Sequence, residues 1–130
     1  MSHIPKELMY TSSHEWVRKE DDTHFVLGIT DHAQGLLGDV VFVDCPEVGD
    51  DVHCGDGIAV TESVKAVTEV FSPLTGTVAA INESLEDEPE SINQDPYGNG
   101  WICKISASDL SELEDLMDAD AYLTVIEEDE

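Results

Sequence analysis

Short apolar runs separated by turn residues are the main pattern along the chain. The runs are four to six residues long, and Gly, Pro and Asp stand between them, as is typical of strands joined by turns. They predict strands at residues 15–18, 24–29, 40–43, 57–62, 67–71, 77–81 and 101–105. Strands this short and this evenly spaced favour a mostly β fold of the small sandwich or flattened-barrel type.

One short stretch between these strands has the start and stop signals of a helix. Residues 30–37 predict a helix with Thr30 as its N-cap, Asp31 in its first turn and Gly38 at its end. The acidic, turn-rich segment 83–100 is interpreted instead as an ordered loop.

The C-terminal region predicts two further helices, over about residues 109–127. Asp109 and Glu112 have the spacing of a capping box, ahead of an apolar face formed by Leu110, Leu113, Leu116 and Met117. Asp118 is the candidate cap of the second helix, with inward-facing Ala121, Tyr122, Val125 and Ile126.

Length and charge narrow the function. The 130 residues predict a single domain, and 5 basic against 30 acidic residues give a formal charge of −25. Such a surface repels phosphate, so neither nucleic acid nor a membrane is expected as a partner. Proteins with basic patches are expected as partners instead, and mutual repulsion favours a monomer. Residues 1–10 contain no apolar leader, which favours the cytoplasm.

The three cysteines also fit a reducing compartment. Cys45, Cys54 and Cys103 are odd in number and widely spaced, which predicts free thiols. They are expected to be buried, because free Cys is among the most buried residue types.

Lys65 stands out because it is the only Lys or Arg between Lys19 and Lys104. It lies in the turn 63–66 of the hairpin predicted over 57–71, and this turn lacks the Gly, Asn or Pro that tight turns prefer. One interpretation is a surface lysine that pairs with Glu62 or Glu69. The other is an attachment point, because a primary amine on a long stem can be acylated and can swing between sites.

The sequence around Lys65 resembles a known family. Residues 57–66 are similar to a lipoyl-lysine hairpin, and their core E-S-V-K-A is the form found in glycine cleavage system H proteins. Further segments match the same family in the same order: S-H-E-W-V at 13–17, G-I-T-D-H-A-Q at 28–34, L-G-D-V-V-F-V at 37–43, D-P-Y at 95–97 and G-W at 100–101.

This resemblance implies a fold, a cofactor and partners. The fold is a lipoyl-domain-like barrel-sandwich hybrid of two small antiparallel sheets with helical additions. The cofactor is lipoate, bound covalently as N6-lipoyl-lysine at Lys65, with Glu62, Ser63, Val64 and Ala66 as the recognition context for the attaching enzyme, a lipoate ligase or a lipoyl/octanoyl transferase.

The resemblance also implies a carrier without catalytic residues or a metal. The arm takes an aminomethyl group from glycine decarboxylase (P protein) to aminomethyltransferase (T protein) and electrons to dihydrolipoamide dehydrogenase (L protein). The loaded arm folds into a surface cleft, for which the candidates by position are Ser13, Glu15 and Glu69. Glu69 stands where the family has Asp, so its side chain is one methylene longer.

Other interpretations remain open at this stage. A biotin carrier shares the hairpin but usually has methionines beside its lysine, where this chain has Val64 and Ala66. A second alternative is a protein that donates its lipoyl group to 2-oxoacid dehydrogenase complexes. A third is an unmodified acidic interaction module. His14 is interpreted as structural, and His53 with Cys54 is a weak metal signal, because no second ligand pair occurs.

Overall fold

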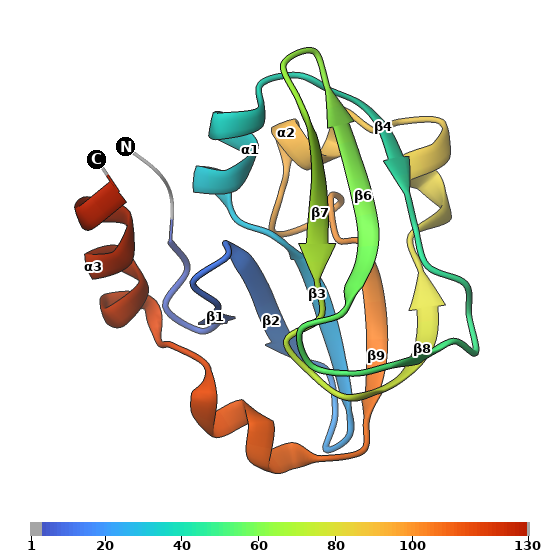
Figure 1. The fold of residues 1–130 in the computed structure, drawn as a ribbon, viewed down its shortest axis with the longest axis vertical. Helices are drawn as coiled ribbons and strands as arrows, with labels where there is room; N and C mark the ends of the chain where they lie inside the picture. The colour runs from blue at the N-terminus through green and yellow to red at the C-terminus, as the bar shows by residue number, and fades with distance from the viewer. Residues whose placement is uncertain (1–3, 130) are drawn as a thin grey trace.

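The computed structural model describes residues 4–129. Two antiparallel sheets form its centre (Figure 1). The larger sheet has the order β1-β2-β3-β9-β8-β5, and the smaller has the order β4-β6-β7. The larger comprises β1 (Met9–Tyr10), β2 (Glu15–Lys19), β3 (His24–Ile29), β5 (Asp51–Val52), β8 (Gly76–Ile81) and β9 (Cys103–Ala107); the smaller comprises β4 (Val40–Asp44), β6 (Gly57–Ser63) and β7 (Val67–Phe71).

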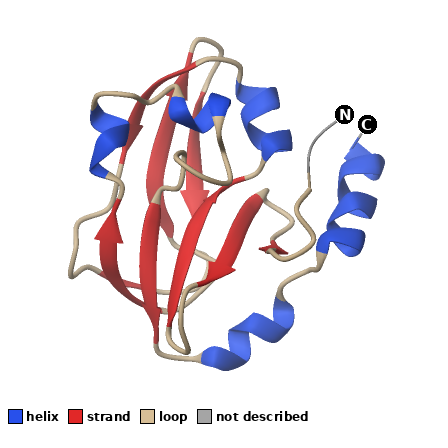
Figure 2. Cartoon of the chain, turned by 180° about the vertical axis from the view of Figure 1, so that it is seen from behind, coloured by secondary structure: helices blue, strands red, loops and turns tan. Residues whose placement is uncertain are grey.

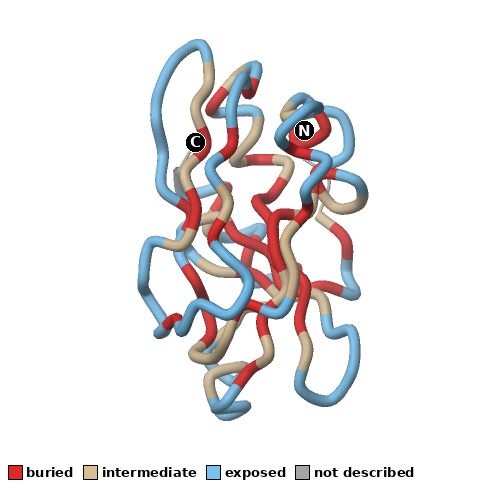
Figure 3. The backbone as a smooth tube through the Cα atoms, turned by 90° about the vertical axis from the view of Figure 1, so that its right-hand side faces the viewer, coloured by how far each residue is buried: buried red, intermediate tan, exposed pale blue. Residues whose placement is uncertain are grey.

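Side chains from both sheets meet in one hydrophobic core. Because strand residues alternate between faces, each strand directs about every second residue inward. Phe25, Leu27 and Ile105 of the larger sheet pack in the same cluster as Val43 and Val70 of the smaller one. Buried residues therefore follow the strands, whereas the β6–β7 turn at the top of the molecule is exposed (Figure 3).

A second hydrophobic cluster lies on the other face of β1, β2 and β3. Trp16 and Val26 pack there with Tyr122 and Ile126 of the C-terminal helix α3 (Ala119–Asp129). The rings of Tyr10 and Tyr122 stack with their centroids 4.7 Å apart. Helix α3 thus runs beside the N-terminal strands (Figure 1), so the two ends of the described chain pack together.

Most of the predicted elements are confirmed. The strands predicted at 24–29 and 67–71 have those bounds, and the other predicted strands differ by one or two residues, the largest shift being that of β9. Trp101 and Ile102, predicted to begin β9, precede it. Two strands of two residues each, β1 and β5, were not predicted, because so short a segment shows no alternation.

The first predicted helix is also confirmed. Helix α1 (Asp31–Leu37) follows Thr30, whose side chain accepts a hydrogen bond from the Ala33 amide, and it ends at Gly38 with a φ of 76°. Segment 83–100 is not only a loop, because it contains the 3-10 helix η1 (Glu83–Glu86) and the short helix α2 (Ser91–Gln94) (Figure 2).

The prediction of an α-helix after Asp109 is wrong. Residues Leu110–Asp115 form a 3-10 helix, η2. The Asp109 side chain does accept from the Ser111 amide, but the Glu112 carboxylate accepts instead from the amide and hydroxyl of Thr75, so no capping box forms. Leu110, predicted on the apolar face, is 45% exposed.

The second C-terminal helix is confirmed with one change. The Asp118 side chain accepts from the Ala121 amide, and Tyr122 and Ile126 are buried as predicted. Ala121, in contrast, is exposed, and Ala119 is buried in its place.

Candidate functional site

Lys65 lies in the exposed turn between β6 and β7, whose pairing ends at Glu62 and Val67. The Ser63 amide donates to the Ala66 carbonyl over 2.8 Å and closes the turn. The Ser63 hydroxyl oxygen accepts from the amides of Lys65 and Ala66, over 3.2 and 3.1 Å. The side chain of Ser63 therefore stabilises this turn without Gly, Asn or Pro.

The turn is fixed to the end of helix α1. The Val64 amide donates to the Asp39 carbonyl over 3.1 Å. The stem of Lys65 passes over Gly38, since a Cβ at position 38 would lie 3.3 Å from Lys65 Cε. Around the lysine, the side chains of Leu36, Val64 and Val67 are each more than 60% exposed.

Lys65 makes no ion pair with Glu62 or Glu69 within residues 4–129, where the lysine pairs are Lys19 with Asp22 and Lys104 with Glu20. The interpretation of Lys65 as a surface lysine that pairs with these neighbours therefore finds no support in its contacts.

A pocket of about 240 Å³ opens beside the turn. Its lining includes Ala66, directly after Lys65, and the three predicted arm-docking candidates Ser13, Glu15 and Glu69. The structure thus brings these residues together from separate parts of the chain. Sequence reasoning missed the remaining lining, which comes from the loop before β2, the end of β3, helix α1 and the hairpin: His14, Ile29, Ala33, Leu36, Leu37, Thr61, Thr68 and Val70.

Glu15 is the buried acid of this pocket, with 2% of its surface exposed. Its Oε1 accepts from the Thr11 hydroxyl over 2.6 Å and from the Ser13 hydroxyl over 2.5 Å. Its Oε2 accepts from the Phe71 amide over 3.3 Å. Burial raises the pKa of Glu15 above its ordinary value, although the hydrogen bonds from Ser13 and Thr11 oppose the shift.

Glu69 supplies a second carboxylate from strand β7, and it is exposed. The carboxylate lies against Gly57 of β6, where a Cβ would overlap it. The glycine at position 57 therefore provides the space that the Glu69 side chain uses.

His14 connects the pocket with the C-terminal helix. It has a φ of 73°, and its Nδ1 lies 2.8 Å from the hydroxyl of Tyr122, which in turn lies 2.6 Å from the hydroxyl of Thr30. These contacts support a structural role for His14, because they fix the loop before β2 to α3.

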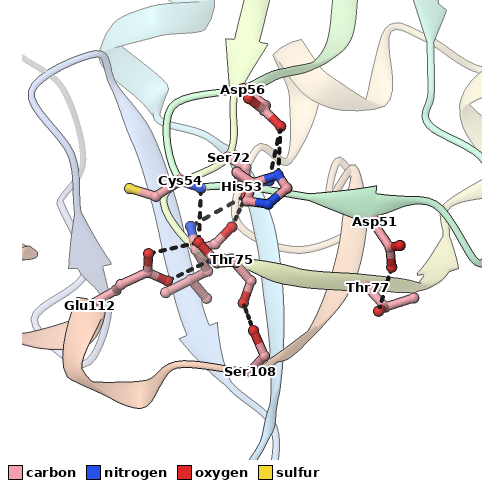
Figure 4. A network of polar contacts seen from close by, with 10 residues as sticks. Asp51, His53, Cys54, Asp56, Ser72, Thr75, Thr77, Ser108 and Glu112 are labelled. Carbon is pink, nitrogen blue, oxygen red and sulfur yellow. Dashed lines mark hydrogen bonds and ion pairs between the residues drawn. The ribbon is translucent and has the colours of Figure 1, made fainter.

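The contacts of His53 and Cys54 do not support a metal site at these two residues. The His53 amide donates to Asp56 and the Cys54 amide donates to Thr75, and the Cys54 sulfur points away from the His53 ring (Figure 4). In the described range, no three His, Cys, Asp or Glu residues gather as metal ligands would.

The cysteines are free, as predicted, but their burial differs. Cys103 is buried and Cys45 is half-buried, whereas Cys54 is exposed, so the expectation of burial is wrong for Cys54. It lies in the connection between β5 and β6, outside both hydrophobic clusters.

Among residues 4–129, no helix has the length and apolar character needed to cross a lipid bilayer.

Comparisons with known proteins agree with this arrangement. The sequence model of the family described as Glycine cleavage H-protein matches residues 8–129. Two relatives named glycine cleavage system H protein, from Shewanella loihica and Idiomarina loihiensis, are 57% and 58% identical to the chain, over 99% of it and 100% of their own length. A crystal structure of a glycine cleavage system H protein from Mycobacterium marinum superposes with a TM-score of 0.82 at 35% identity, over 92% of this chain and 95% of that one. The chain therefore belongs to the glycine cleavage H-protein family.

Proposed function

We propose that the chain is the lipoylated shuttle of the glycine cleavage system, with the lipoyl group on Lys65. Membership of the family supports a lipoyl-carrier role in that system. The observation that carries the finer proposal is the position of Lys65 on an exposed, internally braced turn, directly beside a pocket that contains Ser13, Glu15 and Glu69.

The surroundings of Lys65 suit an acylated arm. The Lys65 amine has no ion pair with a carboxylate in the described part of the chain, which suits access by an attaching enzyme, for which Glu62, Ser63, Val64 and Ala66 form the recognition context. The lipoyl group supplies a dithiolane, which opens to take up a carbon nucleophile and re-forms on oxidation. The apolar wall formed by Ile29, Leu37 and Val70 suits an aliphatic chain.

The polar residues of the pocket suit the cargo. An aminomethyl group on the arm carries a positive charge, and Glu15 and Glu69 are carboxylates that can face it, with Ser13 as a further hydrogen-bond partner. Enclosure in the pocket would keep water away from the labile carbon. The three residues therefore hold and protect the cargo, and the chain performs no catalysis of its own.

We infer that the chain works in the cytoplasm, as a monomer that visits glycine decarboxylase, aminomethyltransferase and dihydrolipoamide dehydrogenase in turn. A charge of −25 favours docking on basic surfaces and fast exchange between them. The affinity for the decarboxylase is accordingly expected to fall as ionic strength rises. An affinity that does not change with salt would contradict electrostatic docking.

Intact-protein mass spectrometry tests the attachment site. Protein from cells supplied with lipoate is expected to carry one lipoyl amide, which peptide mapping locates on Lys65. Lys65→Arg should abolish the modification, whereas Lys19→Arg, an exposed lysine on β2, should retain it. A Lys65 that stays bare after incubation with a lipoate ligase would overturn the proposal, and biotin at Lys65 would indicate a carrier of carboxylases instead.

Glycine-dependent reduction of the arm tests the pathway. Lipoylated protein mixed with the decarboxylase and glycine is expected to gain free thiol beyond that of the exposed Cys54, and the Lys65→Arg variant is not. A gain in thiol that is equally large without glycine would contradict a role in glycine cleavage.

A further inference from the structure

Thr11 lies in the loop between β1 and β2 and hydrogen-bonds Glu15. It does not line the pocket, whereas Ser13 does. Its hydroxyl lies 2.6 Å from Glu15 Oε1, and the backbone closes the same loop, because the Thr11 amide donates to the Glu15 carbonyl over 3.0 Å.

The direction of the Thr11 hydroxyl proton follows from its other contacts. Thr11 Oγ1 lies 3.3 Å from the Ser13 hydroxyl, farther than the 2.6 Å to Glu15 Oε1. The Glu15 amide donates to Thr11 Oγ1 over 3.1 Å, so the oxygen acts as an acceptor there. A hydroxyl has a single proton to give, and Glu15 Oε1 is a carboxylate oxygen that can only accept when ionised. The Thr11 hydroxyl therefore donates its hydrogen bond to Glu15 Oε1.

We propose that Thr11 is a positioning residue, which acts through Glu15 to hold the carboxylate ionised and aligned for the positively charged end of the loaded arm. The inference rests on the proposed function of the pocket. It deepens that function, because it explains how an acid that is 2% exposed is kept in the form that a cation needs.

The physical argument is a balance of burial against hydrogen bonding. Burial disfavours the charged carboxylate, and each donor to it restores part of the loss. Within residues 4–129, the donors from other residues to the Glu15 carboxylate are the hydroxyls of Thr11 and Ser13 and, over 3.3 Å, the Phe71 amide. The Phe71 contact is long, and the Ser13 side chain is itself a candidate ligand of the cargo. Thr11 is thus the donor with no other task in the pocket.

The experiment compares Thr11→Val with Thr11→Ser. Valine keeps the branched shape without the hydroxyl, and serine keeps the hydroxyl. The first measurement is a carbon-13 NMR titration of the Glu15 carboxyl in the unmodified protein, which needs no lipoyl group. We expect Thr11→Val to raise the pKa of Glu15 above its wild-type value and Thr11→Ser to leave it near that value, since only the first loses a donor to the charged form.

The second measurement is the lifetime of the loaded arm. Loss of the aminomethyl group to water releases formaldehyde and ammonium and leaves a free thiol, so each can be followed. We expect the loss to be about tenfold faster in Thr11→Val, as removal of one hydrogen bond to a charged group predicts. Thr124→Val, on the exposed face of α3, is the matched control and should leave both measurements unchanged.

Two outcomes separate this inference from the proposed function. If Glu15→Gln does not shorten the lifetime of the loaded arm, the role of the pocket itself is wrong. If Glu15→Gln shortens it while Thr11→Val changes neither the lifetime nor the pKa of Glu15, the inference on Thr11 alone is wrong. If Thr11→Val unfolds, Thr11→Ala takes its place in both measurements, and the same criteria apply.

Discussion

The turn that presents Lys65 and the wall of the pocket formed by Ser13, His14 and Glu15 are built in opposite ways. The turn is exposed and is braced by backbone amides and the hydroxyl of Ser63. In this wall Glu15 is buried and precedes Trp16 of the second hydrophobic cluster, and His14 contacts Tyr122 of α3. The contacts that hold the turn involve Ser63, Ala66 and Asp39, whereas those that hold this wall come from β2 and α3, so we expect that the attachment point and this wall can be altered separately.

The largest expected effect is on the wall, from Gly28→Ala. A Cβ at position 28 would lie 2.6 Å from the Trp16 ring, and Trp16 is fully buried, so the ring must move. Overpacking of this kind costs about 1–3 kcal/mol of unfolding free energy, measurable by urea denaturation.

Modification of Lys65 by a purified lipoate ligase should be unaffected by Gly28→Ala. Gly35→Ala, in helix α1 with open space around the new Cβ, is the control and should stabilise by up to about 1 kcal/mol. If Gly28→Ala slowed ligation in the folded protein, the turn and the wall would not be separate.

A somewhat smaller effect is expected at the turn, from Gly38→Ala. The φ of 76° at Gly38 is unfavourable for other residues, and the new Cβ would press on the Lys65 stem. We expect a loss of about 1–2 kcal/mol together with slower ligation. Gly49→Ala has a similar strain, at a φ of 95°, but open space around it, so it should lose stability and keep the wild-type ligation rate.

The pH dependence of stability tests the burial of Glu15. Because the folded-state pKa of Glu15 is raised above its ordinary value of 4.5, its contribution to stability is fully present below that value. The contribution is lost as the pH rises through the folded-state pKa.

Glu15→Gln should remove this pH-dependent loss of stability, because a glutamine side chain does not titrate. The difference in unfolding free energy, variant minus wild type, is therefore expected to increase with pH across the same window. Glu127→Gln, on an exposed part of α3, reports the effect of removing one negative charge. Equal pH profiles for the two variants would contradict a raised pKa at Glu15.

The smallest expected effect is that of Ser63→Ala. It removes the acceptor of the Lys65 and Ala66 amides and should cost up to about 1 kcal/mol. Amide hydrogen exchange at Lys65 and Ala66 should become faster, and Ser63→Thr, which keeps a hydroxyl, should restore protection. Unchanged exchange in Ser63→Ala would show that the backbone alone closes the turn.

The sequence predicted the strands well, because they depend on local patterns. The hairpin 57–71 alternates along its strands, and Lys65 is conspicuous among so many acids. The family resemblance gave Ser13, Glu15 and Glu69 as arm-docking candidates by position, and the structure gathers them at one pocket.

The predictions from sequence fail where contacts between residues far apart in the chain determine the local structure. Glu112 was predicted to cap its own helix but hydrogen-bonds Thr75 instead, and this contact accompanies a 3-10 helix in place of an α-helix. The role inferred for Thr11 had no signal in the sequence, since a hydroxyl four residues before an acid is common. Only the folded loop shows that it donates to Glu15.

The pairing of β1 with the C-terminal region has a consequence for synthesis on the ribosome. Tyr10 and Met117 exchange two backbone hydrogen bonds, each of 2.8 Å, and His14 contacts Tyr122. A nascent chain cannot form these contacts until Met117 and Tyr122 have emerged, whereas residues 57–71 emerge much earlier and can pair with each other. The lysine can therefore be presented to a modifying enzyme during translation, before the wall that will shelter its cargo exists.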